Sequence, residues 1–334
     1  MKQLSIIIPV YNVEPYIRTC IESVFRQNLD EDAYEIIIIN DGSTDRSMEI
    51  LSDIISSHNN IIVINQENQG QSVARNVGIE KAQGLYILML DSDDLLADNN
   101  LRKLLNIALE SNSDILVADF SIMSNNEIDS YLSDSNKCTI PKIKIKEYTG
   151  KDFLDEQYCR NVWRFLYNKE FILKTNIRFI PHITAQDVPF ANECFLEAQK
   201  CIMVNIPLTI YRWGNPSQTT MYFNVKKAKD LCIVIRAIWE LAKRNDLSTE
   251  TRHKQENIVY AYFYRLISAT TFGHIKSLPD QYEVIDYMKQ LEPKLCFKNG
   301  TKQIINTLMY KNMPHILIKT YNLVRRIKKL LKGH

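Results

Sequence analysis

The chain has 334 residues, of which 45% are hydrophobic and 24% charged, a composition typical of folded globular proteins and not of disordered or fibrous ones. Its first residues form a short, strand-like apolar run without a small-residue cleavage site, and no apolar run reaches the roughly 18 residues of a membrane-spanning helix. Seven cysteines are scattered singly, without metal-type spacing, as is typical of free thiols in a reducing cytosol. We therefore expect a cytoplasmic protein without a signal peptide or a spanning helix.

The net charge of +2 conceals an uneven distribution. Residues 1–219 contain 20 Lys and Arg against 30 Asp and Glu, whereas residues 220–334 contain 21 against 9. An acidic region joined to a basic one indicates two parts with different partners. We expect a first domain over 1–219, with halves at 1–96 and 97–219, and a basic helical region over 220–334.

Strand and helix patterns alternate in the first part of the chain. We predict strands at 4–10, 34–39, 60–65 and 85–90, and helices at 13–27, 46–57 and 71–82. Gly84 is predicted to end the last of these helices in a left-handed conformation. This alternation is typical of an α/β fold, in which a Rossmann-like, mostly parallel sheet carries helices on both faces and binds ligands at the carboxyl ends of its strands.

The remainder of the chain is less regular. We predict helices at 101–110, 151–159, 169–174 and 189–198, strands at 115–121, 201–206 and 208–212, and a loop at 123–137. Beyond a break at 214–217 the pattern is helical, with segments at 225–245, 251–272, 283–291 and 301–310.

Three aspartates, Asp91, Asp93 and Asp94, directly follow the apolar strand that begins at Leu85. Ionised carboxylates are very costly inside a buried strand, so we expect them at its carboxyl end. A hard divalent ion such as Mg²⁺ or Mn²⁺ would hold them together and often brings phosphates with it. A turn followed by a helix N-cap explains the same residues, and the segment alone leaves both interpretations open.

Polar residues also end the first two predicted strands. Tyr11 and Asn12 follow the first, and Asp41 precedes Gly42 after the second. A carboxylate there can accept a hydrogen bond from a base or ribose, and an aromatic ring can stack on a nucleobase. Taken singly, turn and packing roles are the simpler explanation for these residues.

Four segments in a fixed order, 5–12, 40–45, 68–78 and 91–94, together resemble the nucleotide-binding half of family 2 glycosyltransferases, which have the GT-A fold. The resemblance is strong over 4–96, weaker over 101–220 and absent beyond Tyr222. It implies a metal-dependent, inverting transferase that moves a sugar from a nucleotide sugar, in particular a UDP-sugar, to a glycan or lipid-linked glycan acceptor. The Gln-x-x-Arg-Trp motif of processive members is missing, which favours a non-processive enzyme of the bacterial polysaccharide type.

The resemblance also implies the donor site. Its residues are Pro9, Tyr11 and Asp41 for the uridine base, Gly70, Arg75 and Asn76 for the nucleotide and diphosphate, and Asn12, Glu14, Asp91 and Ser92 beside them. Asp91 and Asp93 match the family's DxD motif, which contacts ribose and metal. Asp93 is expected to be the chief ligand of Mg²⁺ or Mn²⁺.

Residues 183–190 resemble the family's Glu-Asp-x-x-Phe segment, so Asp187 matches the catalytic base. The chain has Gln186 where Glu is usual, which we interpret as a change in acceptor contacts. A helix N-cap is the alternative role for Asp187. Trp163, Arg164 and Tyr167 resemble an acceptor-lobe motif, and 211–212 with Ser217 the closing strand; both groups also fit a role in the core.

Residues 321–332 carry an apolar stripe at helical spacing among five cations, a pattern typical of helices that lie on anionic membrane surfaces. We expect peripheral contact at the inner face of the plasma membrane; packing on the catalytic domain is the alternative. Nucleic-acid binding is not expected, because no stacking aromatics are interleaved with the cations.

Two other functions stay open: a nucleotidyltransferase, although no basic Gly-rich loop follows the first strand, and a sugar-nucleotide-binding protein without catalysis.

Overall fold

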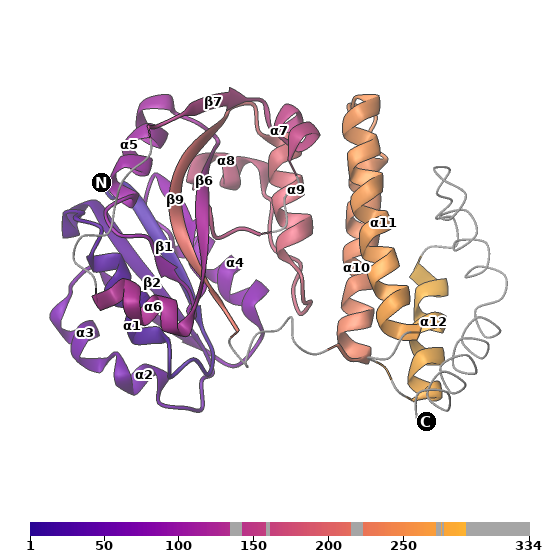
Figure 1. Cartoon of the computed structure of the whole chain (residues 1–334), viewed down its shortest axis with the longest axis horizontal. Helices are drawn as coiled ribbons and strands as arrows, with labels where there is room; N and C mark the ends of the chain where they lie inside the picture. The colour runs from indigo at the N-terminus through magenta and orange to yellow at the C-terminus, as the bar shows by residue number, and fades with distance from the viewer. Residues whose placement is uncertain (134–141, 158–160, 215–222, 272–274, 276, 292–334) are drawn as a thin grey trace. The chain divides into compact units, whose positions relative to one another are not determined.

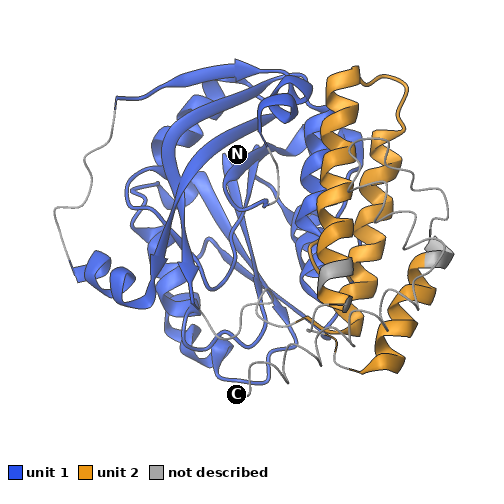
Figure 2. Cartoon of the chain, turned by 45° about the vertical axis from the view of Figure 1, so that its right-hand side comes forward, with its two compact units in different colours: residues 1–182, 186–216 blue, residues 183–185, 217–334 orange. Residues whose placement is uncertain are grey.

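The computed structural model describes residues 1–133, 142–157, 161–214, 223–271, 275 and 277–291 (Figure 1). The chain divides into two compact units, coloured separately in Figure 2. Unit 1 contains residues 1–182 and 186–216, and unit 2 contains residues 183–185 and 217–334.

Unit 1 is built on one nine-stranded mixed sheet, and its α/β class confirms the predicted fold. The strands are β1 (Leu4–Val10), β2 (Tyr34–Asp41), β3 (Ile61–Gln66), β4 (Tyr86–Met89), β5 (Leu95–Leu96), β6 (Ile115–Ser124), β7 (Ile145–Tyr148), β8 (Phe165–Asn168) and β9 (Cys201–Trp213). They lie in the order β3-β2-β1-β4-β8-β6-β9-β5, and β7 pairs with β9. Strands β1 to β4 run parallel, whereas β8 is antiparallel to both β4 and β6.

Helices cover both faces of this sheet. They are α1 (Ile17–Phe25), α2 (Ser47–Ile50), α3 (Ser52–Ser57), α4 (Gln71–Lys81), α5 (Leu101–Ser111), α6 (Asn125–Ser133), α7 (Gly150–Glu156), α8 (Lys169–Thr175) and α9 (Asp187–Glu197), with a short 3₁₀ helix at Glu31–Ala33. Alternate β1 side chains face opposite layers, because a strand has a period of two. Ile6 and Ile8 pack in the core cluster that holds α1 and α5, while Ile7 meets Gly78 of α4.

The predicted loop at 123–137 is wrong over most of its length, because α6 occupies residues 125–133. A capping box explains this helix. The amide and hydroxyl of Ser124 both donate to Glu127 Oε2, and the Glu127 amide donates back to Ser124 Oγ. Ile128 then packs with Leu95 and Ile210, so tertiary burial stabilises a sequence that looks polar. Residues 134–137 of the prediction lie outside the described part of the chain.

The two strands predicted at 201–206 and 208–212 are one continuous strand, β9. Proline lacks the amide that a sheet ladder needs, and Pro207 therefore suggested a break. Pro207 pairs with Asp119, where the register between β6 and β9 shifts irregularly, and a proline is tolerated at such a position.

Smaller corrections concern the first half. Helix α1 begins at Ile17 rather than residue 13, and the helix predicted at 46–57 is divided at Leu51 into α2 and α3. Gly84 is not left-handed. It is required instead by a close approach, because a Cβ there would lie 2.4 Å from the carbonyl carbon of Leu4. Strands β5, β7 and β8 were not predicted; none exceeds four residues, too few for a clear period.

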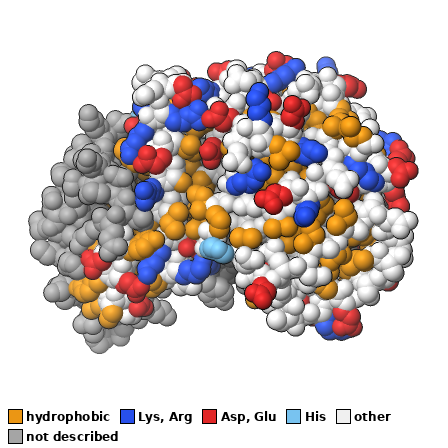
Figure 3. All heavy atoms as spheres, turned by 180° about the vertical axis from the view of Figure 1, so that it is seen from behind, with side chains coloured by type: hydrophobic (Ala, Val, Ile, Leu, Met, Phe, Trp, Pro, Cys, Tyr) orange, Lys and Arg blue, Asp and Glu red, His pale blue; other side chains and the backbone are white. Residues whose placement is uncertain are grey.

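The described part of unit 2 contains the helices α10 (Val225–Ala242), α11 (Thr249–Thr271) and α12 (Leu278–Leu291). Helix α10 buries Leu231, Val234 and Ile238, and Lys229 pairs with Glu283 of α12. The segments predicted at 301–310 and 321–332 lie outside the described residues. None of the helices that the structure describes is long and apolar enough to cross a membrane. On the face in Figure 3, basic and acidic side chains of the described residues are interspersed.

Candidate active site

The carboxyl ends of β1, β2 and β4 meet at one edge of the sheet, because these strands are parallel neighbours. At this edge the turn after β1 interlocks with the loop after β2. Asn12, whose φ is +52°, accepts hydrogen bonds from the amides of Thr44 (2.8 Å) and Asp45 (3.3 Å). Glu14 accepts one from the amide of Arg46 (3.1 Å). The structure therefore places Asn12 and Glu14, both expected at the donor site, in contacts that fix this loop.

Asp41 is almost fully buried at the end of β2. Its Oδ1 accepts hydrogen bonds from Gln66 Nε2 (2.6 Å) and the Gln69 amide (2.8 Å), and its Oδ2 accepts one from the Gly70 amide (2.8 Å). A carboxylate has about four lone-pair sites, and the described residues occupy three of those of Asp41, which leaves one at Oδ2. Gly70 serves this site through its backbone, at a φ of +86°, which favours glycine.

The other residues expected to hold the uracil base of the nucleotide differ in their exposure. Tyr11 is 48% exposed, an accessibility that suits stacking on a base. Pro9 lies within β1, opposite Ile39 of β2. Asn76 exchanges two hydrogen bonds of 2.9 Å with the backbone of Phe179, and thus ties α4 to the chain before α9.

The aspartates after β4 form a strongly negative cluster. Asp94 is buried; its Oδ1 accepts a hydrogen bond from the Arg212 amide (2.8 Å), and its Oδ2 has no partner among the described residues. Burial, and secondly the charges of Asp93 and Asp91, raise the pKa of the Asp94 carboxyl well above its usual range. Burial, and secondly the charges of Asp94, Asp93 and Asp91, also raise the pKa of Tyr211. Such a cluster favours a bound cation.

The described residues contain no group of three or more His, Cys, Asp or Glu side chains that could by itself hold a metal ion. Mg²⁺ does not require one, since it is commonly bound by one or two carboxylates together with substrate phosphates and water. Asp91 and Asp93 at the strand end fit that pattern. Ser92 between them is buried.

A buried arginine connects the aspartates after β4 to Asp187, the residue expected to be the catalytic base. Arg75 Nη2 donates to Asp91 Oδ1 (2.6 Å), and Arg75 Nη1 donates to Asp187 Oδ1. The guanidinium also lies 5.1 Å from the centre of the Phe179 ring. Only 1% of the Arg75 side chain is exposed, and its Nε has no partner among the described residues. Arg75 thus binds two carboxylates here, although it was expected to line the diphosphate.

Asp187 is the first residue of α9, but it does not cap the helix. The N-cap position is Gln186, without a side-chain capping bond, and the Asp187 carboxylate turns to Arg75. Burial raises the pKa of Asp187; Arg75 opposes this effect and the charge of Asp91 adds to it, so that the net shift is upward. A carboxylate with a raised pKa is a stronger base than an ordinary aspartate.

Sequence reasoning missed a chain of amides beside these carboxylates. Gln186 Nε2 donates to Gln71 Oε1 (2.7 Å), and Gln71 Nε2 donates to Asp91 Oδ1 (2.9 Å). Gln66 and Gln69, which hold Asp41, were missed as well. Gln69 and Gln71 flank Gly70 inside the segment that carried the family resemblance, and this position was the available signal.

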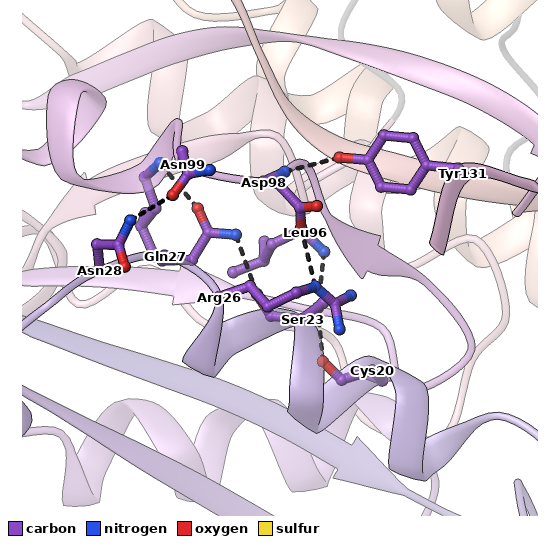
Figure 4. A network of polar contacts seen from close by, with 10 residues as sticks. Cys20, Ser23, Arg26, Gln27, Asn28, Leu96, Asp98, Asn99 and Tyr131 are labelled. Carbon is purple, nitrogen blue, oxygen red and sulfur yellow. Dashed lines mark hydrogen bonds and ion pairs between the residues drawn. The ribbon is translucent and has the colours of Figure 1, made fainter. Parts of the chain in front are cut away.

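Helix α1 fixes the chain that leaves the aspartates (Figure 4). Ser23 Oγ accepts a hydrogen bond from the amide of Leu96 (2.9 Å), and Arg26 Nε pairs with Asp98 (3.0 Å). The hydroxyl of Tyr131 on α6 accepts one from the amide of Asp98 (2.9 Å). These bonds hold the segment after β4 between two helices and limit its movement.

The residues expected in the acceptor half lie in different environments. Tyr167 is fully buried against Phe165 and Phe190, which places it in the core. Trp163 stacks on Tyr211, with ring centres 5.6 Å apart. Arg212 donates through Nε to the carbonyl of Asp93 (2.7 Å) and so supports the aspartate turn.

Because Arg75 and Asp187 form an ion pair, we expect substitutions at these two positions to have non-additive effects on the free energy of unfolding. Replacing Arg75 with Met should lower the free energy of unfolding by about 2–4 kcal/mol, because two partly buried carboxylates lose their partner. In an Asp187→Asn background the same change should cost less, with a coupling energy of about 0.5–3 kcal/mol in a double-mutant cycle by urea unfolding. Replacing the exposed Arg102 with Met is the control and should show no coupling to Asp187. Additive effects of the Arg75 and Asp187 changes would contradict the pairing.

Comparisons with known proteins identify the family of the chain. Residues 5–172 match the model of the family described as "Glycosyl transferase family 2". The uncharacterized glycosyltransferase EpsJ of Bacillus subtilis is 37% identical over 226 residues, covering 65% of this chain and 62% of EpsJ. The uncharacterized glycosyltransferase YibD of Escherichia coli is 33% identical over 230 residues, covering 66% of this chain and 64% of YibD. The chain thus spans less than two thirds of the length of these two relatives.

A solved structure shares the fold over nearly the whole chain. The crystal structure of S. aureus TarS residues 1–349 in complex with UDP-GlcNAc superposes with a TM-score of 0.72 at 18% sequence identity, covering 98% of this chain and 92% of that chain. The family model covers half of the chain. The matched residues include β1, β2 and β4, the strands that form the candidate site. The chain therefore belongs to glycosyltransferase family 2.

Proposed function

We propose that this protein is an inverting glycosyltransferase that moves a sugar from a UDP-sugar to a hydroxyl of a glycan or lipid-linked glycan. The observation that carries this proposal is the bridge of Arg75 between Asp91 and Asp187. It holds a carboxylate suited to general-base catalysis beside the aspartates suited to a metal–diphosphate complex. The UDP-GlcNAc in the TarS structure supports a UDP-sugar as the donor.

In the proposed donor complex, Asp93 chiefly, and Asp91, hold Mg²⁺ or Mn²⁺. When bound, the ion stabilises the negative charge that develops on the nucleoside diphosphate leaving group. Asp41 accepts a hydrogen bond from the base through its remaining Oδ2 site, and Tyr11 offers its exposed ring for stacking. Gly70 contributes its backbone beside Asp41.

In the acceptor half, Asp187 accepts the proton of the attacking hydroxyl as the sugar is displaced from the opposite face, which inverts the anomeric centre. Arg75 keeps the Asp187 carboxylate oriented. Because Asp187 must be ionised to accept a proton, activity should fall as the pH drops through its pKa. Burial places this pKa above that of an ordinary aspartate, so the loss should begin at a higher pH.

The first test concerns the metal. Asp93→Ala should abolish Mn²⁺-dependent binding of UDP in calorimetry while leaving the thermal unfolding of the protein nearly unchanged, because this residue lies in a turn at the strand end. The matched control is Asp129→Ala, which removes an exposed carboxylate from α6 and should leave UDP binding intact. If the Asp93 variant binds Mn–UDP as tightly as the unmodified protein, Asp93 is not the metal ligand.

The second test concerns the base. Asp187→Asn retains an oxygen that can accept from Arg75, but an amide cannot take a proton. Transfer should fall by about 10²–10⁴-fold while the affinity for the donor stays nearly constant. Stopped assays of sugar transfer, with calorimetry of UDP binding as the control, measure both quantities. Unchanged turnover would exclude Asp187 as the base, and loss of UDP binding would assign it a structural role.

We further propose that residues 321–332, which lie outside the described part of the chain, hold the protein at an anionic membrane where a lipid-linked acceptor resides. Each cation near such a surface contributes roughly 1 kcal/mol, and salt screens the attraction. Deleting 321–334 should abolish co-sedimentation with phosphatidylserine vesicles at low salt and leave Mn–UDP binding intact. Neutral vesicles are the control. Equal sedimentation of full-length and truncated protein would overturn the proposal.

A further inference from the structure

Arg164 lies at the same sheet edge as the aspartates. It immediately precedes β8, which is antiparallel to β4, with Leu166 opposite Leu88. The amino-terminal end of β8 therefore lies beside the carboxyl end of β4, from which Asp91 follows. On its other side, the carbonyl of Arg164 accepts a hydrogen bond from the amide of Ala118 in β6 (3.1 Å). The backbone of Arg164 is thus fixed between β4 and β6.

Two aromatic rings hold the guanidinium of Arg164. Its central carbon lies 5.6 Å from the centre of the Phe120 ring and 5.3 Å from that of the Phe165 ring. The residue is half-buried, and its Nε is buried without a hydrogen-bond partner. Such contacts orient a guanidinium and partly desolvate it, but they do not neutralise its charge.

Two other arginines at this edge use their charge on protein groups. Arg75 pairs with Asp91 and Asp187, and Arg212 donates to the carbonyl of Asp93 and to Asn125. The guanidinium of Arg164, in contrast, forms neither a hydrogen bond nor an ion pair with any residue that the structure describes. A half-buried, oriented and unpaired guanidinium is an uncommon arrangement, because buried charge is costly unless something pairs with it.

We propose that Arg164 binds an oxyanion, a phosphate or carboxylate, carried by the acceptor close to the hydroxyl that receives the sugar. This inference rests on the proposed glycosyltransferase function and narrows its acceptor to an anionic one. The guanidinium fork matches two oxygens of a phosphate or carboxylate, and the Phe120 and Phe165 contacts hold its plane in place before the ligand arrives. In the proposed donor complex the diphosphate would be neutralised by a metal held at Asp93, which would leave Arg164 for the acceptor.

Binding of a small oxyanion tests the site directly. The full chain is saturated with Mg–UDP, so that the donor site is filled, and methyl phosphate and acetate are titrated in turn, followed by ³¹P and ¹³C NMR line broadening. At least one should bind with a dissociation constant on the order of millimolar, and the better one distinguishes phosphate from carboxylate. Arg164→Gln should weaken that binding at least about tenfold.

Two further variants make the result specific. Arg102→Gln, which removes an exposed arginine from α5, should bind the anion as the unmodified protein does. Arg164→Lys keeps the positive charge but lacks the two-pronged guanidinium, so it should bind the anion more weakly. This variant replaces Arg164→Gln in the titration if the Gln variant does not fold. Absence of binding by the unmodified protein, or equal binding by the unmodified protein and the Arg164 variants, would overturn the proposal.

A donor-side measurement separates this proposal from the proposed function. The slow, sugar-dependent release of UDP from a UDP-sugar in water requires no acceptor, and its KM for the donor should be the same in Arg164→Gln as in the unmodified protein. A severalfold rise in that KM would assign Arg164 to the donor and overturn the acceptor role. If the unmodified protein releases no UDP from any UDP-sugar, the proposed function fails, whereas the anion titration still reports on Arg164 by itself.

Discussion

The site depends on one buried cation. Arg75 joins Asp91, which follows β4, to Asp187, which lies 112 residues further along the chain from Arg75 itself. Without this guanidinium, two carboxylates would face each other across a partly buried space, an arrangement that costs several kcal/mol or forces one of them to bind a proton. Arg75 therefore allows the proposed base and the proposed metal-binding aspartate to lie close together.

The position of Arg75 in turn depends on how α4 meets the sheet. The helix begins after Gly70, whose positive φ turns the chain, and Gly78 lets it approach β1 so closely that a Cβ would lie 2.3 Å from Ile7. Asn76 then binds the backbone of Phe179, and the Phe179 ring lies against the guanidinium of Arg75. Two glycines and one asparagine thus direct a long, charged side chain into the protein and hold it there.

Sequence patterns predicted the elements in which the hydrophobic period repeats clearly over a long segment. Strand β1 has the predicted bounds, and β2, α4 and α5 differ from prediction by two residues or fewer at each end. The patterns failed where tertiary contacts decide. Strand β5 has two residues and exists because it pairs with β9, and helix α6 combines a polar sequence with a capping box. The box Ser124-x-x-Glu127 was legible in the sequence, but the continuity of β9 through Pro207 was not.

The same division holds for the site. The family resemblance placed Asp41, Asp91 and Asp187 in one site, and the contacts of Arg75 and Gln71 explain how residues from separate elements meet. What the sequence could not predict is which partner each side chain takes. An arginine in a segment expected to bind a diphosphate can reach phosphate or carboxylate, and the sequence does not show that Asp187 lies within hydrogen-bond distance of Arg75.

Charge balance explains why the site needs further positive charge when a donor binds. Four carboxylates gather at the edge, those of Asp91, Asp93, Asp94 and Asp187, and the raised pKa values of Asp94 and Asp187 reflect burial together with this mutual repulsion. The diphosphate of the proposed donor would add more negative charge to the same place, so a divalent ion is the simplest means of bringing it close to the proposed base. Gln186 is consistent with this constraint. Its neutral amide lies one hydrogen bond from Gln71, which itself contacts Asp91, whereas a glutamate there would add a fifth carboxylate.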